Sequence, residues 1–242
     1  MYAIFKKEIT LFFSSLIGYI TIGVFLLAVG LFMWVLPDFN IFDNNYATLE
    51  QLFSIAPFVF MFLIPAITMR SFAEEQKTGT IEILSTKPVT DFQIVMGKFW
   101  AGMVLVIFSL LPTLLYFYTV SDLAVPKGNI DTGATWGSYI GLLFLGGAYL
   151  AIGLFASSLT DNQIVSFIVG MFLCFFFYQL LDFLRGLSFL NSADALFESI
   201  SIQSHYTSIS RGVVDTRDLV YFISFIAVFL LTTKTIIQSR KW

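Results

Sequence analysis

The sequence predicts an all-α, polytopic membrane protein, and three observations support this prediction. Of the 242 residues, 57% are hydrophobic and only 12% are charged, whereas about a quarter of the residues of a soluble domain are charged. Six apolar segments are long enough to cross a bilayer as helices, which takes about 20 residues each. Because no repeat, low-complexity tract or linker separates them, we expect a single transmembrane domain over residues 1–242.

Residues 1–16 predict an amphipathic helix in the membrane interface. Large apolar side chains recur at spacings of three and four residues, and polar side chains take the opposite face. The apolar residues are Phe5, Ile9, Phe12 and Leu16, and the polar residues are Lys7, Thr10 and Ser14. This pattern is typical of a helix that lies in the plane of the interface. The alternative is that these residues extend the first span.

Six transmembrane helices are expected after this interfacial helix. They are Ile17–Leu36, Leu52–Met69, Phe99–Val120, Trp136–Ser158, Ile164–Leu181 and Leu219–Thr235. The first is too long for the core of a signal peptide, and no cleavage site of small residues follows it. We therefore expect this segment to be retained.

The positions of Lys and Arg predict that both termini are cytoplasmic, because cytoplasmic loops carry an excess of these residues. This orientation places nine of them inside, namely Lys6, Lys7, Arg70, Lys77, Lys87, Lys98, Lys234, Arg240 and Lys241. It leaves four outside, namely Lys127, Arg185, Arg211 and Arg217. The first outer loop, residues 37–51, carries Asp38, Asp43 and Glu50 but no Lys or Arg. We therefore expect a multi-pass protein of the cytoplasmic (inner) membrane.

The lengths and compositions of two loops predict how the chain is arranged around them. Residues 159–163 form a very tight turn, so the fourth and fifth spans should be antiparallel neighbours. Residues 182–218 form the longest outer segment, in which large apolar residues are mixed with charges. These apolar residues are Phe183, Leu187, Phe189, Leu190, Leu196, Phe197 and Ile200. Because a wholly solvated loop does not need them, we expect short helices that re-enter the outer leaflet, where protein can bury non-spanning backbone.

The predicted spans contain almost no ionisable residues. The first five have no Asp, Glu, Lys, Arg or His, and the sixth has only Lys234, at an end from which it can reach the interface. Ionisable residues at mid-membrane usually mark proton relays or ion paths. Their absence argues against a proton-coupled antiporter, a pump with its own ion site and a voltage sensor.

Small residues recur four apart in the fourth and fifth spans, a spacing that lets helix backbones approach closely. They are Gly137, Gly141, Gly147, Ala151, Ser166, Gly170 and Cys174. The pattern favours either packing within the bundle or a subunit interface. Pro57 and Pro65 should kink the second span, and Pro112 the third.

The chain's cysteine and histidine counts exclude several kinds of site. Cys174 is the only cysteine, so neither a disulfide nor a cysteine metal site is expected. One histidine, His205, excludes an HExxH zinc site. We expect His205 to be a surface or interfacial residue, because no partner ligand is near it in sequence. The net charge of −3 gives no reason to expect binding to nucleic acid.

Residues 70–90, RSFAEEQKTGTIEILSTKPVT, form a charged, helix-breaking segment between the second and third spans. The second span should continue past Met69, because Arg70 with Glu74 and Glu74 with Lys77 are pairs at helical spacing. Gly79 should then end this helix in a left-handed conformation. The alternative is a solvated loop that happens to be charged.

A second short helix is expected between Thr80 and Pro88. Thr80 is a good N-cap, and Glu82 falls in the first turn, where the helix dipole favours an acid. Lys87-Pro88 should end this helix. Thr90 and Gln93 then predict a capping box that opens the helix of the third span.

The run E-E-x-K-x-G-T-x-E-x-L-x-x-x-P-V resembles the loop between the second and third spans of ABC-2-type transporter permeases. The matching residues are Glu74, Glu75, Lys77, Gly79, Thr80, Glu82, Leu84, Pro88 and Val89. The six spans, the amphipathic N-terminal helix and the long outer segment are also similar to that family. The resemblance therefore covers the whole chain, although only this loop is motif-specific. Within the family, the chain is most similar to gliding-motility-associated ABC transporter permease subunits.

The resemblance implies an exporter-type permease subunit that a separate ABC ATPase drives. In such transporters this loop carries a coupling helix that docks onto the ATPase, and the permease dimerises, with a second copy or a related permease, around the substrate path. An accessory membrane protein is a further candidate partner within the lipid bilayer. The implied coupling residues are Glu74, Glu75, Gly79, Thr80, Glu82, Leu84 and Pro88.

One feature of the sequence independently agrees with a permease subunit that a separate ATPase drives. The chain has no GxxxxGK[ST] phosphate loop, so it should not hydrolyse ATP itself, and a partner would bind ATP and Mg²⁺. We expect no catalytic residue, cofactor or metal site in this chain. One alternative is a channel or membrane scaffold without ATP coupling. A remote one is an intramembrane protease, which needs a catalytic Ser and His at depth, whereas His205 lies in the outer segment.

Overall fold

The structure, a computed structural model, is all-helical with no strands over the residues that it describes, which are 1–37, 40–42, 46–80, 88–185, 194–212 and 215–239. Helical segments long and apolar enough to span a membrane are Leu16–Trp34, Glu50–Lys77, Asp91–Leu123, Thr132–Leu159, Gln163–Arg185 and Thr216–Ser239. Each overlaps one of the six predicted spans. The predicted all-α, polytopic architecture is therefore confirmed.

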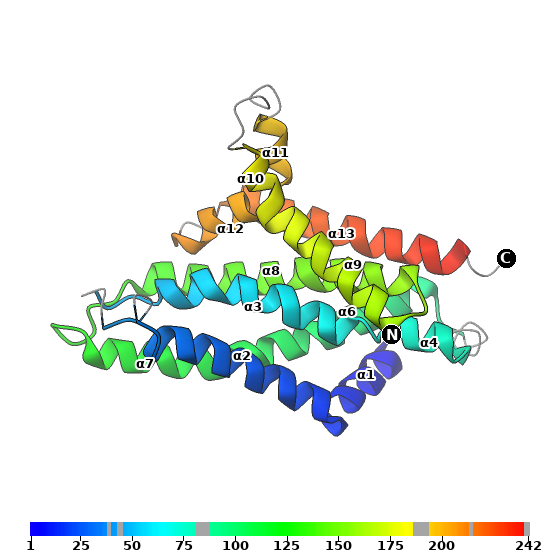
Figure 1. Ribbon diagram of the computed structural model, residues 1–242, viewed down its shortest axis with the longest axis horizontal. Helices are drawn as coiled ribbons and strands as arrows, with labels where there is room; N and C mark the ends of the chain where they lie inside the picture. The colour runs from blue at the N-terminus through cyan, green and yellow to red at the C-terminus, as the bar shows by residue number, and fades with distance from the viewer. Residues whose placement is uncertain (38–39, 43–45, 81–87, 186–193, 213–214, 240–242) are drawn as a thin grey trace.

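The segments are divided into the following elements, which Figure 1 shows. The helices are α1 (Tyr2–Ser14), α2 (Leu16–Trp34), α3 (Glu50–Thr68), α4 (Ala73–Lys77), α6 (Asp91–Leu110), η1 (Leu111–Thr113), α7 (Leu114–Leu123), α8 (Thr132–Leu159), α9 (Gln163–Phe175), η2 (Phe176–Leu180), α10 (Leu181–Arg185), α11 (Asp194–Ile200), α12 (Ile202–Ser210) and α13 (Thr216–Ser239). α1, α4 and the end of α13 lie in one half of the molecule, and α12 and the starts of α3 and α8 lie in the other.

The N-terminal segment forms a helix of its own, which is inclined to the first span (Figure 1). The two helices are separate because the backbone of Ser15 is extended, with φ −99° and ψ 153°. Residues 1–16 therefore do not simply extend the first span. On α1, Ile4, Glu8 and Phe12 are buried, and the predicted apolar residues Phe5 and Ile9 pack against the cluster that contains Phe12, whereas Leu16, the first residue of α2, is 74% exposed.

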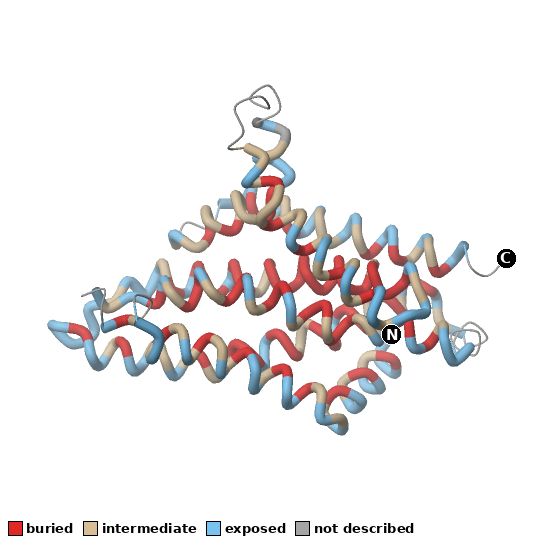
Figure 2. The backbone as a smooth tube through the Cα atoms, in the orientation of Figure 1, coloured by how far each residue is buried: buried red, intermediate tan, exposed pale blue. Residues whose placement is uncertain are grey.

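Helix α8 is the centre of the bundle, and its buried residues continue along most of its length (Figure 2). It packs against α3, α6, α9, α12 and α13. The small residues on α8 allow these contacts. A Cβ atom on Gly153 would overlap the side chain of Thr68 on α3, and one on Gly146 would lie 2.8 Å from Val106 on α6.

The small residues of α8 and α9 are therefore used within the bundle, one of the two predicted possibilities. A Cβ atom on Gly141 would lie 3.1 Å from Ile209 of α12, and one on Gly147 would lie 3.1 Å from Ile226 of α13. On α9, Gly170 faces Pro65 of α3. Ser166 and Cys174 are buried as well. α8 and α9 are also neighbours, as the tight turn between them predicts.

The third span begins and is interrupted where local signals in the sequence indicate. Pro112 lies in the 3₁₀ turn η1, which separates α6 from α7, whereas Pro57 and Pro65 lie inside the single helix α3, and the kink expected there stays a prediction. The predicted capping box is confirmed: the Thr90 hydroxyl accepts from the backbone N–H of Gln93, and the Gln93 side chain accepts from the N–H of Thr90. Because α6 begins at Asp91, it starts eight residues before the predicted span.

The long outer segment contains two different parts. α10 and α11 project from the bundle (Figure 1), and Phe183 and Ile200 are exposed. α12, in contrast, packs on α8, and the hydroxyl of its buried Tyr206 donates to the carbonyl oxygen of Phe53 at 2.7 Å. Leu187, Phe189 and Leu190 lie outside the described residues. Re-entry of this segment into the outer leaflet stays a prediction.

Candidate coupling site

The turn that follows α3 is fastened to the end of α8. As predicted, the second span continues past Met69 and its helical segment runs to Lys77, but a turn at residues 69–72 separates α3 from α4. The hydroxyl of Ser157 fills this break: it accepts from the backbone N–H groups of Phe72 at 2.9 Å and Ala73 at 3.1 Å, and donates to the Met69 carbonyl oxygen. It satisfies N–H groups that the start of a helix leaves without partners.

Lys98 of α6 lies directly behind this turn, with only 2% of its side chain exposed. Its ammonium donates to the Glu8 carboxylate at 2.9 Å, the Glu75 carboxylate at 2.9 Å and the Ser71 carbonyl oxygen at 2.7 Å. These three acceptors match the three N–H donors of a lysine ammonium. A buried charge is tolerated only with such pairing.

Lys7 of α1 completes what we call the ion-pair cluster, which consists of Lys7, Glu8, Glu75 and Lys98. Its ammonium lies 2.9 Å from the Glu75 carboxylate and 3.7 Å from that of Glu8. Partial burial lowers the pKa of Lys7, but the hydrogen bond and charge of Glu75 and the charge of Glu8 outweigh it. The pKa of Lys7 therefore lies above its ordinary value. Two positive and two negative groups thus join α1, α4 and α6.

Consecutive residues of α4 have opposite surroundings. Glu75 is buried in the ion-pair cluster, whereas Glu74 is exposed, because neighbouring residues on an α-helix point about 100° apart. A cavity of about 200 Å³ lies beside the cluster and is lined also by Arg70, Glu74 and Thr80. Because Glu75 pairs with Lys7 of α1 and Lys98 of α6, a movement of α4 must either carry α1 and α6 with it or break these buried ion pairs.

The end of α4 is exposed and has the predicted break. Gly79 has φ +69°, in the left-handed region, as its place in the sequence predicts. Thr80 is also exposed, and its hydroxyl donates to the carbonyl oxygen of Glu75 at 3.4 Å and bonds with the hydroxyl of Thr78 at 3.0 Å. This end of the segment is held by backbone geometry and weak local bonds, with its outer surface open.

A family model described as ABC-2 family transporter protein matches residues 2–238. The chain belongs to the ABC-2 transporter family. A search of curated proteins found no match. The family match and the six apolar helices make the chain a membrane permease component of an ABC transporter, a class that carries no ATPase of its own. The family resemblance read from residues 70–90 is thus confirmed at this level.

The structure of this ABC-2 permease separates the predicted coupling residues into three groups. Glu74, Gly79, Thr80 and Pro88 are exposed. Glu82 and Leu84, with the expected short helix around them, lie outside the described residues. Glu75 is turned inward and forms ion pairs with α1 and α6.

The predicted pairs of Glu74 with Arg70 and Lys77 do not form among the described residues. The backbone spacing of Arg70 and Glu74 is still helical, because the N–H of Glu74 donates to the carbonyl oxygen of Arg70 at 3.3 Å. Lys77, the last residue of α4, is exposed and extends into solvent.

Sequence reasoning missed three residues of this ABC-2 permease site: Glu8, Lys98 and Ser157. Two of them had detectable signals. The capping box at Thr90 places Lys98 two turns inside an apolar helix, where a lysine needs partners. Glu8 is four residues from both Ile4 and Phe12, so it shares their face of α1. Ser157 had no such signal.

His205, predicted to be a surface or interfacial residue rather than a metal ligand, has a partner on another helix. Its Nδ1 lies 2.7 Å from the Asp218 carboxylate of α13, and its ring stacks on that of Tyr221 with centroids 3.9 Å apart. Its side chain is 20% exposed. His205 therefore joins α12 to α13 and has a structural role in this fold.

Proposed function

We propose that this permease is the exporter-type membrane subunit of a complex in which a separate ABC ATPase acts on the segment at residues 70–90. The ATPase binds ATP and Mg²⁺ and contacts the exposed residues Glu74, Gly79, Thr80 and Pro88, together with Glu82 and Leu84. The permease pairs with a second copy or a related permease, and both termini lie on the cytoplasmic side of the inner membrane.

The observation that supports this proposal most strongly is the ion-pair cluster behind the segment. A solvated loop would move without consequence for the bundle. Here α4 is tied to α1 and α6 through Glu75, and to α8 through Ser157. A force applied to the exposed side of α4 would therefore reach three helices through buried contacts that are expensive to break.

The remaining parts of the proposal rest on the sequence. The orientation follows from the excess of Lys and Arg at the end that holds α1 and α4. A role in gliding motility follows from overall sequence similarity to such permease subunits. An accessory membrane protein is a further proposed partner.

The coupling proposal predicts opposite results for two glycines in the same backbone conformation. Gly79 and Gly128 have φ of +69° and +81°, and a Cβ atom on either meets nothing within 4 Å. Valine strains the backbone similarly at both positions, because left-handed φ is unfavourable for a β-branched residue. We expect Gly79→Val to reduce co-purification of the ATPase at least about tenfold, and Gly128→Val, at the opposite end, to leave it unchanged.

The measurement is the amount of ATPase recovered with the permease from native membranes, after each variant is shown to insert normally. The same measurement is made on two variants with the same change of charge. Less ATPase should be recovered with Glu74→Lys, whereas recovery with Asp122→Lys should be unchanged. Full ATPase recovery with both Gly79→Val and Glu74→Lys would refute the assignment of this segment as the contact.

A further inference from the structure

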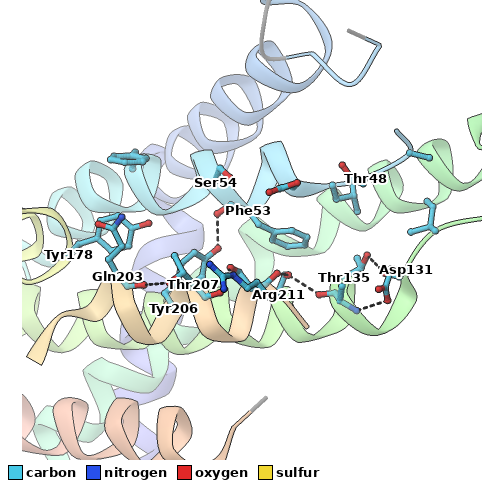
Figure 3. Close-up of a pocket in the computed structure, with 18 residues that line it drawn as sticks. Thr48, Phe53, Ser54, Asp131, Thr135, Tyr178, Gln203, Tyr206, Thr207 and Arg211 are labelled. Carbon is cyan, nitrogen blue, oxygen red and sulfur yellow. Dashed lines mark hydrogen bonds between the residues drawn. The ribbon is translucent and has the colours of Figure 1, made fainter. Parts of the chain in front are cut away.

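A second cavity, lined by charged and polar as well as apolar residues, lies in the half of the molecule away from α4. Its volume of about 640 Å³ is within the range of small-molecule sites, about 300–1,000 Å³. It lies between the start of α3, the start of α8, and α12, with Tyr178 of η2 at one end (Figure 3). The candidate spans that begin at Glu50 and Thr132 both start here. The cavity is thus at the level where these helices leave the apolar part of the bilayer.

Charges of both signs line this cavity without neutralising one another. Glu50 and Asp131 contribute carboxylates, and Arg211, at the end of α12, contributes a guanidinium. Among the residues that the structure describes, none of the three forms an ion pair. Asp131 uses one oxygen to cap α8, accepting from the N–H of Ala134 at 2.9 Å, and this leaves its second oxygen for a ligand.

One buried polar atom on the lining also lacks a partner. Oε1 of Gln203 is buried and forms no hydrogen bond among the described residues, and such buried atoms usually mark the place of a water or ligand. Figure 3 shows Gln203 and Tyr178 at one end of the cavity, Thr135 and Asp131 at the other, and Arg211 between them. An anionic group at Arg211 would therefore have hydrogen-bond acceptors for a cationic group on both sides.

The surroundings of the cavity suit a lipid. Tyr46, before the start of α3, and Trp136, near the start of α8, are exposed, and Phe58, more than two turns inside α3, lines the cavity. Exposed aromatic residues at the ends of spans are typical of the headgroup level of a membrane. A ligand at this depth thus has its headgroup at the cavity and its acyl chains along the bundle.

We propose that this cavity binds the headgroup of phosphatidylethanolamine, a phosphate joined to a primary ammonium. Arg211 donates to the phosphate oxygens, for which a guanidinium has suitable geometry. The carboxylates of Glu50 and Asp131 accept from N–H groups of the ammonium. Two carboxylates against one guanidinium repel a purely anionic headgroup, and a trimethylated ammonium has no N–H to donate. This site is separate from the coupling site and does not depend on the proposed function.

The test compares lipids with identical acyl chains and different headgroups. Detergent-purified, delipidated permease is titrated with phosphatidylethanolamine, phosphatidylcholine or phosphatidylglycerol, and the rise in Tm gives an apparent Kd. We expect the ethanolamine lipid to bind at least about tenfold more tightly than the other two, because charge-assisted hydrogen bonds are lost in each of them. Arg211→Gln should weaken its binding about tenfold. Glu50→Gln should weaken it similarly while leaving phosphatidylglycerol binding no weaker.

Matched controls are available at the end of α7 and in the segment after it, where Lys127 pairs with Asp122 of α7 at 3.7 Å. Lys127→Gln and Asp122→Asn should bind phosphatidylethanolamine like the unchanged protein. Equal affinity for phosphatidylethanolamine and phosphatidylglycerol would overturn the proposal, as would unchanged binding by both Arg211→Gln and Glu50→Gln. Soluble glycerophosphoethanolamine should bind far more weakly than the lipid. Equally tight binding of this soluble compound would overturn the lipid assignment and identify the ligand as a free zwitterion.

Discussion

Replacing Lys98 with methionine should destabilise the permease by about 3–5 kcal/mol, the usual cost of removing one partner from a buried ion pair. Methionine keeps much of the side-chain volume of Lys98, but it leaves Glu8 and Glu75 with only the half-exposed Lys7 as a counter-charge. The measurement is the free energy of unfolding in a fixed detergent, compared with that of the unchanged protein. The Ser71 carbonyl oxygen also loses its donor in this variant.

A triple variant separates loss of charge balance from poor packing. Lys98→Met combined with Glu8→Gln and Glu75→Gln removes the uncompensated negative charges while keeping the side-chain volumes. It should recover a substantial part of the lost stability, since neutral replacement of a buried ion pair is often tolerated. A loss below about 1 kcal/mol in Lys98→Met, or no recovery in the triple variant, would show that the cluster does not hold α1, α4 and α6 together.

Ser157→Ala should be the second most damaging substitution in this region. Removal of one hydroxyl leaves the N–H groups of Phe72 and Ala73 without their acceptor, at a cost of about 1–3 kcal/mol for each buried group. Ser158→Ala is the matched control, because Ser158 is equally buried and its hydroxyl makes only a local bond to the Phe155 carbonyl oxygen. Protease sensitivity of residues 69–72 should rise in Ser157→Ala and not in Ser158→Ala. Equal behaviour of the two variants would contradict the role given to Ser157.

The features that could be predicted from the sequence are those that depend on neighbouring residues. Span positions follow from runs of apolar residues, and the starts of α6 and α9 follow from local caps. Thr90 forms the expected capping box, and Asn162 caps α9 through the N–H groups of Ile164 and Val165. The left-handed conformation of Gly79 is equally local.

The contacts that connect the candidate coupling site to the bundle could not be predicted in the same way. Glu8 and Lys98 are 90 residues apart in sequence, and Ser157 is 85 residues from Phe72. No periodicity in the chain specifies such pairs. The burial of Lys98 was not predicted, because the apolar run of the third span begins at Phe99 and Lys98 was counted as a cytoplasmic charge outside it. Helix α6 begins earlier, at Asp91, and therefore includes Lys98. The resemblance gives Glu74 and Glu75 the same coupling role, although only Glu74 is exposed.

Site-specific photo-cross-linking tests the central claim, that an ATPase acts on the exposed side of α4, most directly. A photoreactive amino acid is placed at Glu74, which is exposed on α4, and separately at Asp122, which is exposed near the opposite end of the bundle. After irradiation of intact cells, we expect a covalent adduct with a protein that carries a GxxxxGK[ST] phosphate loop from position 74 and none from position 122. An adduct with such a protein from position 122 alone would contradict the account.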